Sequence, residues 1–298
     1  MAWSEDRMHR WLATRARPRV LAGSRGHDAA VLRELGGRTV VCVDACIEGV
    51  HFEAGTSPGR VGRKAVGRAL SDLAATAARP RALLVAIVAP CACTEKTLRA
   101  LILGAIAAGR EHGAELVGGD LCAGRGPLSI TVTALGVFPA RRRPPGRDRA
   151  RVGQRVVVTG PCGGSILGRH LRIAARVAEG QALCAAGATA LMDVSDGLAW
   201  DLHRLARASG VAIEIEADAI PIHRDARRLA LRTRRSPLDH ALHDGEDHEL
   251  IATLPARAPS QPWHTLGLVA RGSGLWITSA DGKRRLWTHA AGGFEHGG

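Results

Sequence analysis

The residues most able to do chemistry are six aspartates, each in a short segment that contains glycine, serine or alanine. They are Asp28, Asp44, Asp72, Asp120, Asp193 and Asp196. Most of them lie at the end of a predicted strand or at a turn, and such positions in α/β sheets gather at one edge and form ligand sites. Six ionised carboxylates repel one another unless cations offset their charge. Mg²⁺ prefers oxygen ligands and often carries a phosphate group. The pattern predicts a phosphoryl-transfer or ATP-using enzyme with several Mg²⁺ ions.

The densest acidic stretch is MDVSDGLAWDL, residues 192–202. Its apolar start predicts a strand, and the pattern after Gly197 predicts a helix, so Asp193, Ser195 and Asp196 fall on the turn between them. An alternative is that Ser195 or Asp196 only caps the helix and the other acids are solvated. We expect Asp201 to be a polar residue on the first turns of the helix, without a role in the site.

The composition favours a soluble cytoplasmic protein of two domains. The chain has 298 residues, of which 46% are hydrophobic, and this length exceeds one typical domain. Its seven cysteines are scattered without a paired zinc-binding pattern, which is typical of reduced thiols in the cytoplasm. The N-terminus lacks the pattern of a signal peptide, and no uncharged stretch approaches the roughly 20 residues that cross a membrane.

The formal net charge of +13 suggests an anionic partner. Almost all of the positive charge is arginine, because the chain has lysine only at positions 64, 96 and 283. A GC-rich genome also produces this composition. Aromatic residues that could stack on bases are few, which argues against nucleic acid as the main partner.

The predicted elements describe a mixed α/β protein. In the first half, strands are expected at 39–43, 82–88, 114–117 and 128–137, and helices after Ser57-Pro58 and after Thr94. The apolar strand at 82–88 is expected to be buried on both faces. The arginine-rich run at 139–153, after the last of these strands, is expected to be a loop. We therefore predict an N-terminal domain at 1–140, a linker at 141–152 and a C-terminal domain at 153–298.

The second half is expected to contain strands, helices and a glycine-rich turn. Strands are predicted at 155–159 and 211–216 and in the tail, and helices at 164–186, after Gly197 and near 224–232. The turn at 160–168 could cradle a phosphate, but its spacing is not that of a P-loop.

Taken in order, the motifs resemble those of the thiamine-monophosphate kinases, a family in the superfamily that includes aminoimidazole ribonucleotide synthetase. The matching segments are GHDAAVL, VDACIEGVHF, KAVGRALSDLAATAARP, GGDLCAGRGPLSITVTALG, RVAEGQAL, MDVSDGLAWDL, ASGVAIEIEADAIPI, ALHDGEDHEL and GGFEH, between residues 26 and 296. The resemblance implies a two-domain α/β fold, with N-terminal sheets that pair into a barrel in a homodimer. Each C-terminal domain would cover one side of the nucleotide cleft.

The resemblance also implies a reaction and a set of site residues. ATP would phosphorylate thiamine monophosphate directly, with Mg²⁺, to give thiamine diphosphate. All six aspartates would be metal ligands. The nucleotide contacts would be Gly119, Asp120, Arg147 and Ser195. The substrate contacts would be His51, Glu246 and Phe294. Catalysis would rest on Asp120, Arg147 and Asp196 through positioning and charge neutralisation, because the acceptor phosphate is already anionic.

The chain departs from the family pattern at several positions. His27 stands where an acid is usual, Cys42 and Val43 replace hydroxyl residues, and Leu121-Cys122 follows GGD. Two alternatives therefore stay open: a superfamily enzyme with another substrate, or a catalytically weak paralogue that binds nucleotide. Relatives that form selenophosphate use a reactive Cys and Lys near the N-terminus, and neither residue precedes Cys42 here.

Overall fold

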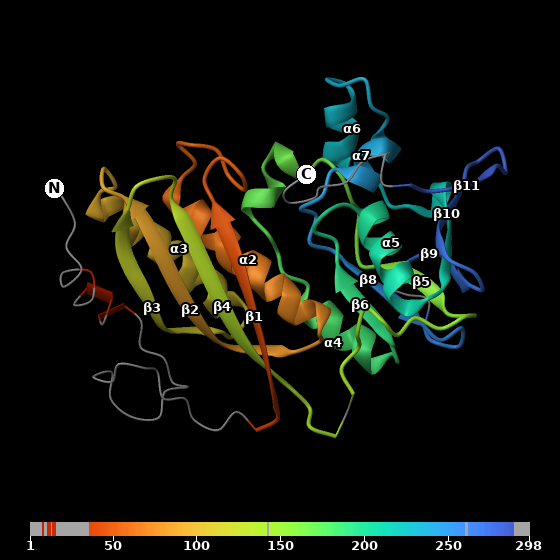
Figure 1. Cartoon of the computed structure of the whole chain (residues 1–298), viewed down its shortest axis with the longest axis horizontal. Coiled ribbons are helices and arrows are strands. Elements are labelled where there is room, and N and C mark those ends of the chain that lie inside the picture. The colour runs from red at the N-terminus through yellow and green to blue at the C-terminus, as the bar shows by residue number, and fades with distance from the viewer. Residues whose placement is uncertain are drawn as a thin grey trace. The chain divides into compact units, whose positions relative to one another are not determined.

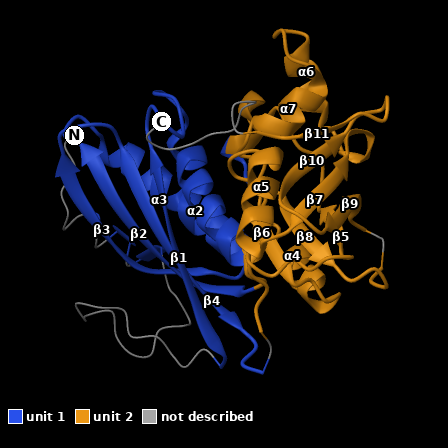
Figure 2. Cartoon of the chain, turned by 45° about the vertical axis from the view of Figure 1, so that its right-hand side comes forward, with its two compact units in different colours: residues 1–73, 78–142, 171–173 blue, residues 74–77, 143–170, 174–298 orange. Residues whose placement is uncertain are grey.

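The structure is a computed structural model that describes residues 8, 11–12, 14–15, 36–141, 143–259 and 262–288. The chain divides into two compact units (Figure 2). Unit 1 comprises residues 1–73, 78–142 and 171–173, and unit 2 comprises residues 74–77, 143–170 and 174–298. The domain boundaries that the sequence suggested stay a prediction.

Unit 1 is a four-stranded sheet with the strand order β1-β4-β2-β3 (Figure 1). The strands are β1 (Arg38–Ile47), β2 (Arg79–Pro90), β3 (Glu115–Gly124) and β4 (Ser129–Phe138). β4 pairs antiparallel with β1 and β2, whereas β2 and β3 are parallel. The helices α2 (Pro58–Ala75) and α3 (Glu95–Glu111) complete this mixed α/β unit.

Helices α2 and α3 follow from their sequences. In α2, Val61, Ala65, Ala69 and Leu73 recur at helical spacing, and each is at most 1% exposed. In α3, the N-cap Thr94 accepts a hydrogen bond from the Thr97 N–H. The two helices approach closely, since a Cβ built on Gly104 would lie 2.1 Å from the Gly59 carbonyl oxygen.

The other face of this sheet is not covered by a helix among the described residues of unit 1; we call it the open face. Cys42 and Asp44 contact α2 through Ala69 and Arg68, so alternate residues of β1 point away from the helices. Val41 and Val43 are each 64% exposed, and Val88 of β2 is 43% exposed. The expectation that β2 is buried on both faces is therefore wrong, because Val88 is exposed and the described helices α2 and α3 lie on the opposite side of the sheet.

Unit 2 contains a seven-stranded sheet in the order β11-β10-β7-β9-β5-β8-β6. Its strands are β5 (Arg155–Val158), β6 (Ala190–Asp193), β7 (Ala212–Glu216), β8 (Leu250–Leu254), β9 (His264–Ala270), β10 (Gly274–Thr278) and β11 (Arg284–Leu286). Its helices are α4 (Val177–Ala185), α5 (Leu198–Ser209), α6 (Arg224–Ala230) and α7 (Pro237–His243).

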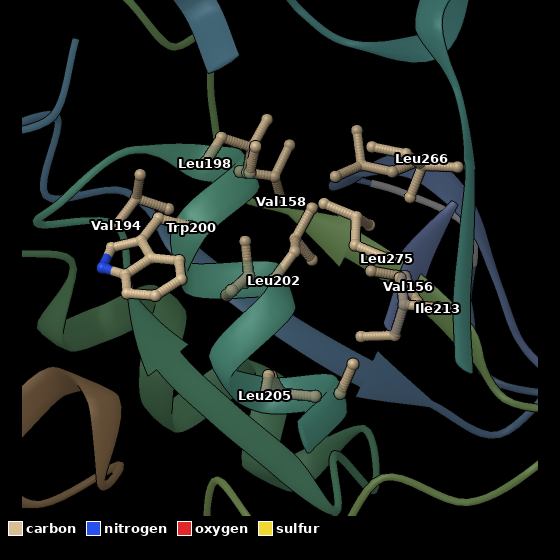
Figure 3. Packing of buried hydrophobic residues seen from close by; sticks show 14 of the residues in the cluster. Val156, Val158, Val194, Leu198, Trp200, Leu202, Leu205, Ile213, Leu266 and Leu275 are labelled. Carbon is tan, nitrogen blue, oxygen red and sulfur yellow. The ribbon is translucent and has the colours of Figure 1, made fainter. Parts of the chain in front are cut away.

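Helix α5 is anchored in the core of unit 2 (Figure 3). Leu198, Leu202 and Leu205 are fully buried and belong to a cluster that includes Val156 and Ile213 of the sheet. The helix ends at Gly210, which is left-handed with φ of 65°. This packing fixes the point at which α5 begins, and with it the acidic turn that precedes the helix.

Three local predictions differ from the structure. The region 164–186 is helical only in two short 3-10 turns and in α4. β3 continues through Gly118, Gly119 and Asp120 instead of ending before them, because residues 118–124 keep pairing with β2. Helix α7, which the sequence analysis missed, begins at Ser236-Pro237 with a side-chain cap.

Candidate active site

The acidic turn Val194–Gly197 connects the buried strand β6 to α5 in unit 2. Asp193, the last residue of β6, is 3% exposed, whereas Ser195 and Asp196 are half-buried. Gly197 has φ of 118°, a conformation that strongly favours glycine. The sequence therefore presents Ser195 and Asp196 on a sharp turn that is anchored at both ends.

A second acidic loop, residues 244–249, runs beside this turn. The Val194 N–H donates to Glu249 O at 2.8 Å, the His248 N–H to Val194 O at 2.8 Å, and the Glu246 N–H to Ser195 O at 2.7 Å. Glu246 and His248 have positive φ of 50° and 51°, which costs about 1–3 kcal/mol per residue. These main-chain bonds hold the strained loop and place Glu246 next to Ser195.

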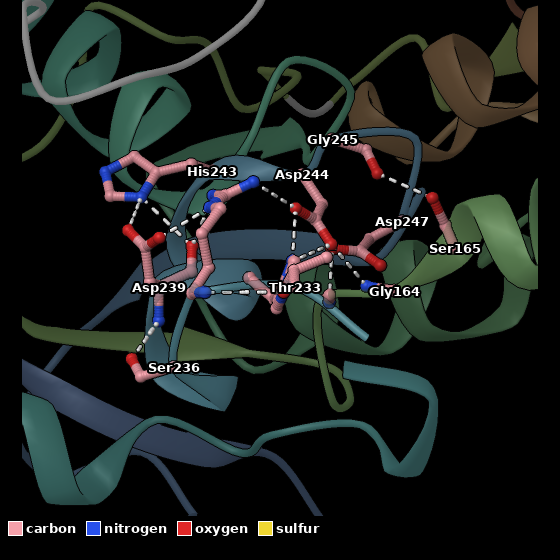
Figure 4. Close-up of polar contacts among 12 residues, drawn as sticks. Gly164, Ser165, Thr233, Ser236, Asp239, His243, Asp244, Gly245 and Asp247 are labelled. Carbon is pink, nitrogen blue, oxygen red and sulfur yellow. Dashed lines mark hydrogen bonds and ion pairs between the residues drawn. The ribbon is translucent and has the colours of Figure 1, made fainter. Parts of the chain in front are cut away.

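The glycine-rich turn at 160–168 supports the second loop (Figure 4). The Gly163 N–H donates to an Asp247 carboxylate oxygen at 2.8 Å, and the Gly164 N–H donates to Asp244 at 2.9 Å. The Ser165 hydroxyl donates to Gly245 O at 2.8 Å. Because aspartate carboxylates already bind the N–H groups of Gly163 and Gly164, this turn positions the acidic loop, and these two groups are not open to a phosphate.

Two buried acids of this loop are held by arginines. Asp247 is 8% exposed, and burial raises its pKa from 3.8 to about 6, although Arg169 and the Gly163 N–H favour the charged form. Glu249 accepts two hydrogen bonds from Arg176, at 2.9 and 2.6 Å. It also accepts one from the Thr159 hydroxyl at 2.6 Å. Such bidentate pairs are geometrically specific, so they fix the loop in one position.

Asp201 lies on the first turn of α5, as expected, but it is not a solvated polar residue. Its side chain is fully buried, and one carboxylate oxygen accepts hydrogen bonds from the N–H groups of Ser195 and Asp196, both at 3.0 Å. Burial is the main cause that raises its pKa to about 8, followed by the charges of Asp193 and Asp196. The buried side chain gives the N–H groups of Ser195 and Asp196 the hydrogen-bond acceptor that main-chain groups require when they are shielded from water.

The two predicted metal ligands of unit 2 have protein partners. Asp196 forms an ion pair with Arg204, and Asp193 lies 3.3 Å from the His248 ring. Their oxygen donors suit a hard divalent cation such as Mg²⁺. Within the described part of the chain, no three or more His, Cys, Asp or Glu side chains are grouped as a metal site.

The predicted ligands of unit 1 are distributed over its sheet. Asp44 of β1 forms two hydrogen bonds of 3.1 Å with Arg68 of α2, and Asp72 is four residues from Arg68 on the same side of that helix. Asp120 is on β3, three strand spacings or roughly 14 Å from β1. It also points to the open face, because its neighbour Leu121 is buried. Unit 1 therefore does not bring Asp120 to Asp44.

The tautomer of the neutral His51 ring is set by a main-chain hydrogen bond. Its Nδ1 accepts from the Ile47 N–H at 3.0 Å, so the neutral ring carries its proton on Nε2. This tautomer suits the predicted contact between His51 and a substrate phosphate.

The remaining predicted residues are Gly119, Arg147, Asp28 and Phe294, of which the structure describes the first two. A Cβ on Gly119 would lie 2.0 Å from Val85 O, so close strand pairing requires glycine there. Arg147 is exposed, and its carbonyl oxygen accepts from the Ser209 hydroxyl at 2.9 Å. Asp28 and Phe294 lie outside the described residues.

Three residues of these two loops and of α5 were not among the predicted site residues: Asp201, Arg204 and His248. One pattern in the sequence could have indicated Asp201: it follows Leu198 by three residues and so shares the buried stripe of α5. The i,i+3 spacing of Asp201 and Arg204 on α5 is a second local signal, whereas the contact of His248 with Asp193 depends on loop geometry that no local pattern predicts.

Comparisons with known proteins identify the family of the chain. The family described as AIR synthase related protein matches with its N-terminal domain at residues 26–138 and with its C-terminal domain at 154–258. A thiamine-monophosphate kinase of Rhodopirellula baltica is 36% identical, over 95% of this chain and 94% of its own length.

Solved structures give the same result. The thiamine-monophosphate kinase of Stenotrophomonas maltophilia K279a has a TM-score of 0.78 and 31% identity, over 95% of this chain and 98% of its own. AaThiL complexed with AMPPCP and TMP has a TM-score of 0.79 and 28% identity, over 98% of this chain and 95% of its own. The chain therefore belongs to the AIR synthase related proteins and, among them, to the thiamine-monophosphate kinase family.

Proposed function

We propose that this protein phosphorylates thiamine monophosphate with ATP, giving thiamine diphosphate and ADP. The observation that carries the proposal is 36% identity to a thiamine-monophosphate kinase over 95% of this chain. A similar protein is complexed with AMPPCP and TMP, which supports a site for a nucleotide and a thiamine phosphate together.

The transfer is direct. An oxygen of the thiamine phosphate forms a bond to the γ-phosphorus, and the bond from that phosphorus to the β,γ-bridging oxygen breaks, so that ADP leaves. The attacking oxygen is anionic at neutral pH, and no strong general base is needed. Positioning and charge neutralisation supply the catalysis.

The predicted residues divide these tasks. Gly119, Asp120, Arg147 and Ser195 contact ATP, and Arg147 neutralises phosphate charge. His51 donates from Nε2 to the substrate phosphate. Glu246, which the main chain holds beside Ser195, offsets the cationic ring, and Phe294 stacks on it.

Mg²⁺ is proposed as the cofactor because every predicted ligand is a carboxylate. The ligands are Asp28, Asp44, Asp72, Asp120, Asp193 and Asp196. When bound, Mg²⁺ neutralises the phosphate oxygens and aligns the γ-phosphoryl group.

A homodimer with a closed barrel is also proposed. Val41, Val43 and Val88 are exposed on the open face of the unit 1 sheet, and β1 and β3 are its edge strands among the described residues, so each has a side available for further pairing. A second copy of the same sheet would cover the face and pair the edges.

No helix in the described residues is both long and apolar enough to span a bilayer. None of the seven cysteines forms a disulfide bond. Reduced thiols support a reducing compartment, and we propose the cytoplasm.

The test is a product assay with purified protein, ATP, Mg²⁺ and thiamine monophosphate. We expect thiamine diphosphate and ADP in equal amounts, and neither without enzyme. The variant D196N, which keeps the shape of the side chain but removes its charge, should lose turnover and stay folded. Absence of thiamine diphosphate from folded wild-type protein would reject this function.

A further inference from the structure

The acidic turn of unit 2 is organised by a residue outside the predicted site. Asp201 lies in the first turn of α5, and its own N–H donates to the Gly197 carbonyl at 2.9 Å. Its side chain reaches back to the turn and accepts from the N–H groups of Ser195 and Asp196. An N-cap side chain would do the reverse and accept from the helix, but the N-cap here is Gly197, which has no side chain to do so.

Arg204, one turn further along α5, joins the two acids. Its guanidinium pairs with Asp196 and lies 3.4 Å from the second carboxylate oxygen of Asp201. The same guanidinium lies 4.9 Å from the centre of the Trp200 ring, which restricts its position. Asp201 therefore contacts the predicted metal ligand Asp196 in two ways, through its main-chain N–H and through a shared arginine.

We propose that Asp201 is a positioning residue for the phosphoryl transfer, which sets the direction in which Ser195 and Asp196 meet the nucleotide and its cation. The proposal rests on the proposed function. The side chain of Asp201 is fully buried and accepts from the turn, so in this proposal it acts through Ser195 and Asp196. Mutation of residues that orient metal ligands without binding the metal lowers metal affinity or activity by about 10- to 100-fold.

A purely structural role for Asp201 makes a different prediction. In that case its loss would lower stability but leave nucleotide affinity in the folded fraction unchanged. Asp225 is a matched control because it is 8% exposed, lies in the first turn of α6, and contacts His223 and Arg228 rather than the acidic turn.

The experiment compares wild type, D201A, D201N and D225N by calorimetric titration with AMPPCP and Mg²⁺, after circular dichroism has confirmed folding. D201A should weaken nucleotide binding and lower kcat about 10- to 100-fold, without a change in KM for thiamine monophosphate. D201N should lose less, since its amide oxygen still accepts from both N–H groups while its NH₂ group cannot pair with Arg204. D225N should bind as wild type. If D201A does not fold, D201N decides.

Wild-type affinity and kcat in folded D201A and D201N would overturn the proposal, and so would an equal loss in D225N. If wild type binds AMPPCP with Mg²⁺ but makes no thiamine diphosphate, the proposed function fails, while the binding comparison still tests Asp201. If wild type binds no nucleotide, both proposals are rejected.

Discussion

At the scale of single residues, the acids of unit 2 differ in their environments rather than in their chemistry. Asp196 is half-buried beside Arg204, whereas Asp201 and Asp247 are buried among main-chain N–H groups and arginines. The half-buried side chain of Asp196 can offer oxygen atoms to a cation, and the buried carboxyl groups of Asp201 and Asp247 stabilise the loops. Residue type alone therefore does not separate a ligand from a residue that supports it.

Asp247 gives a prediction about pH. Its pKa rises from 3.8 in the unfolded chain to about 6 in the folded protein, so the folded state binds the proton more tightly. The stability that this proton contributes is fully present below pH 3.8 and is lost as the pH rises through about 6. The amide of the variant D247N does not titrate, so this variant does not lose stability in the same way. Relative to wild type, its free energy of unfolding should rise between pH 4 and 7.5, by at most about 3 kcal/mol. Urea unfolding at several pH values measures this difference, and parallel curves for the two proteins would contradict it.

At the scale of elements, glycines decide how closely helices and strands approach. Gly104 of α3 leaves no space for a Cβ against Gly59 O, whereas a Cβ on Gly59 would meet its nearest atom at 3.6 Å, an ordinary contact. Strand pairing imposes a similar limit on Gly119. A glycine inside a nucleotide motif can thus be required by packing as well as by a ligand.

The two helix glycines should respond to alanine in opposite directions. G104A should destabilise unit 1 by about 1–3 kcal/mol, because the helices must move apart. G59A should be neutral or stabilising by up to about 1 kcal/mol, since alanine favours the helix and space is available. Denaturant unfolding of both variants checks the prediction. Equal stability of G104A and wild type would show that the α2–α3 contact adapts.

At the scale of the whole molecule, the open face of the unit 1 sheet determines the predicted assembly. Wild type should sediment as a dimer at micromolar concentration. V41K places a charge among the apolar side chains of that face and should shift the protein to the monomer, with unit 2 still folded. L231K is the control, because Leu231 is 88% exposed in unit 2. A monomeric wild type, or a dimer that V41K leaves intact, would contradict the barrel.

The sequence by itself determined the mixed α/β class, the helices α2, α3 and α5, and the family. These features depend on neighbours in the chain: the stripe from Val61 to Leu73, the cap at Thr94, the glycine stop at Gly210, and motifs in a fixed order. Such patterns are local, and a single sequence shows them directly.

Only the tertiary structure decided which groups satisfy one another. The Gly163 N–H meets Asp247 across 84 residues, His248 meets Asp193 across 55, and the open face of β2 depends on where two helices pack. Even Asp201, only six residues from Ser195, bonds to it because α5 is docked on the core and turns that side chain inward. Burial and hydrogen-bond partners are properties of the folded chain, and a buried polar group must find its partner there, however distant in sequence.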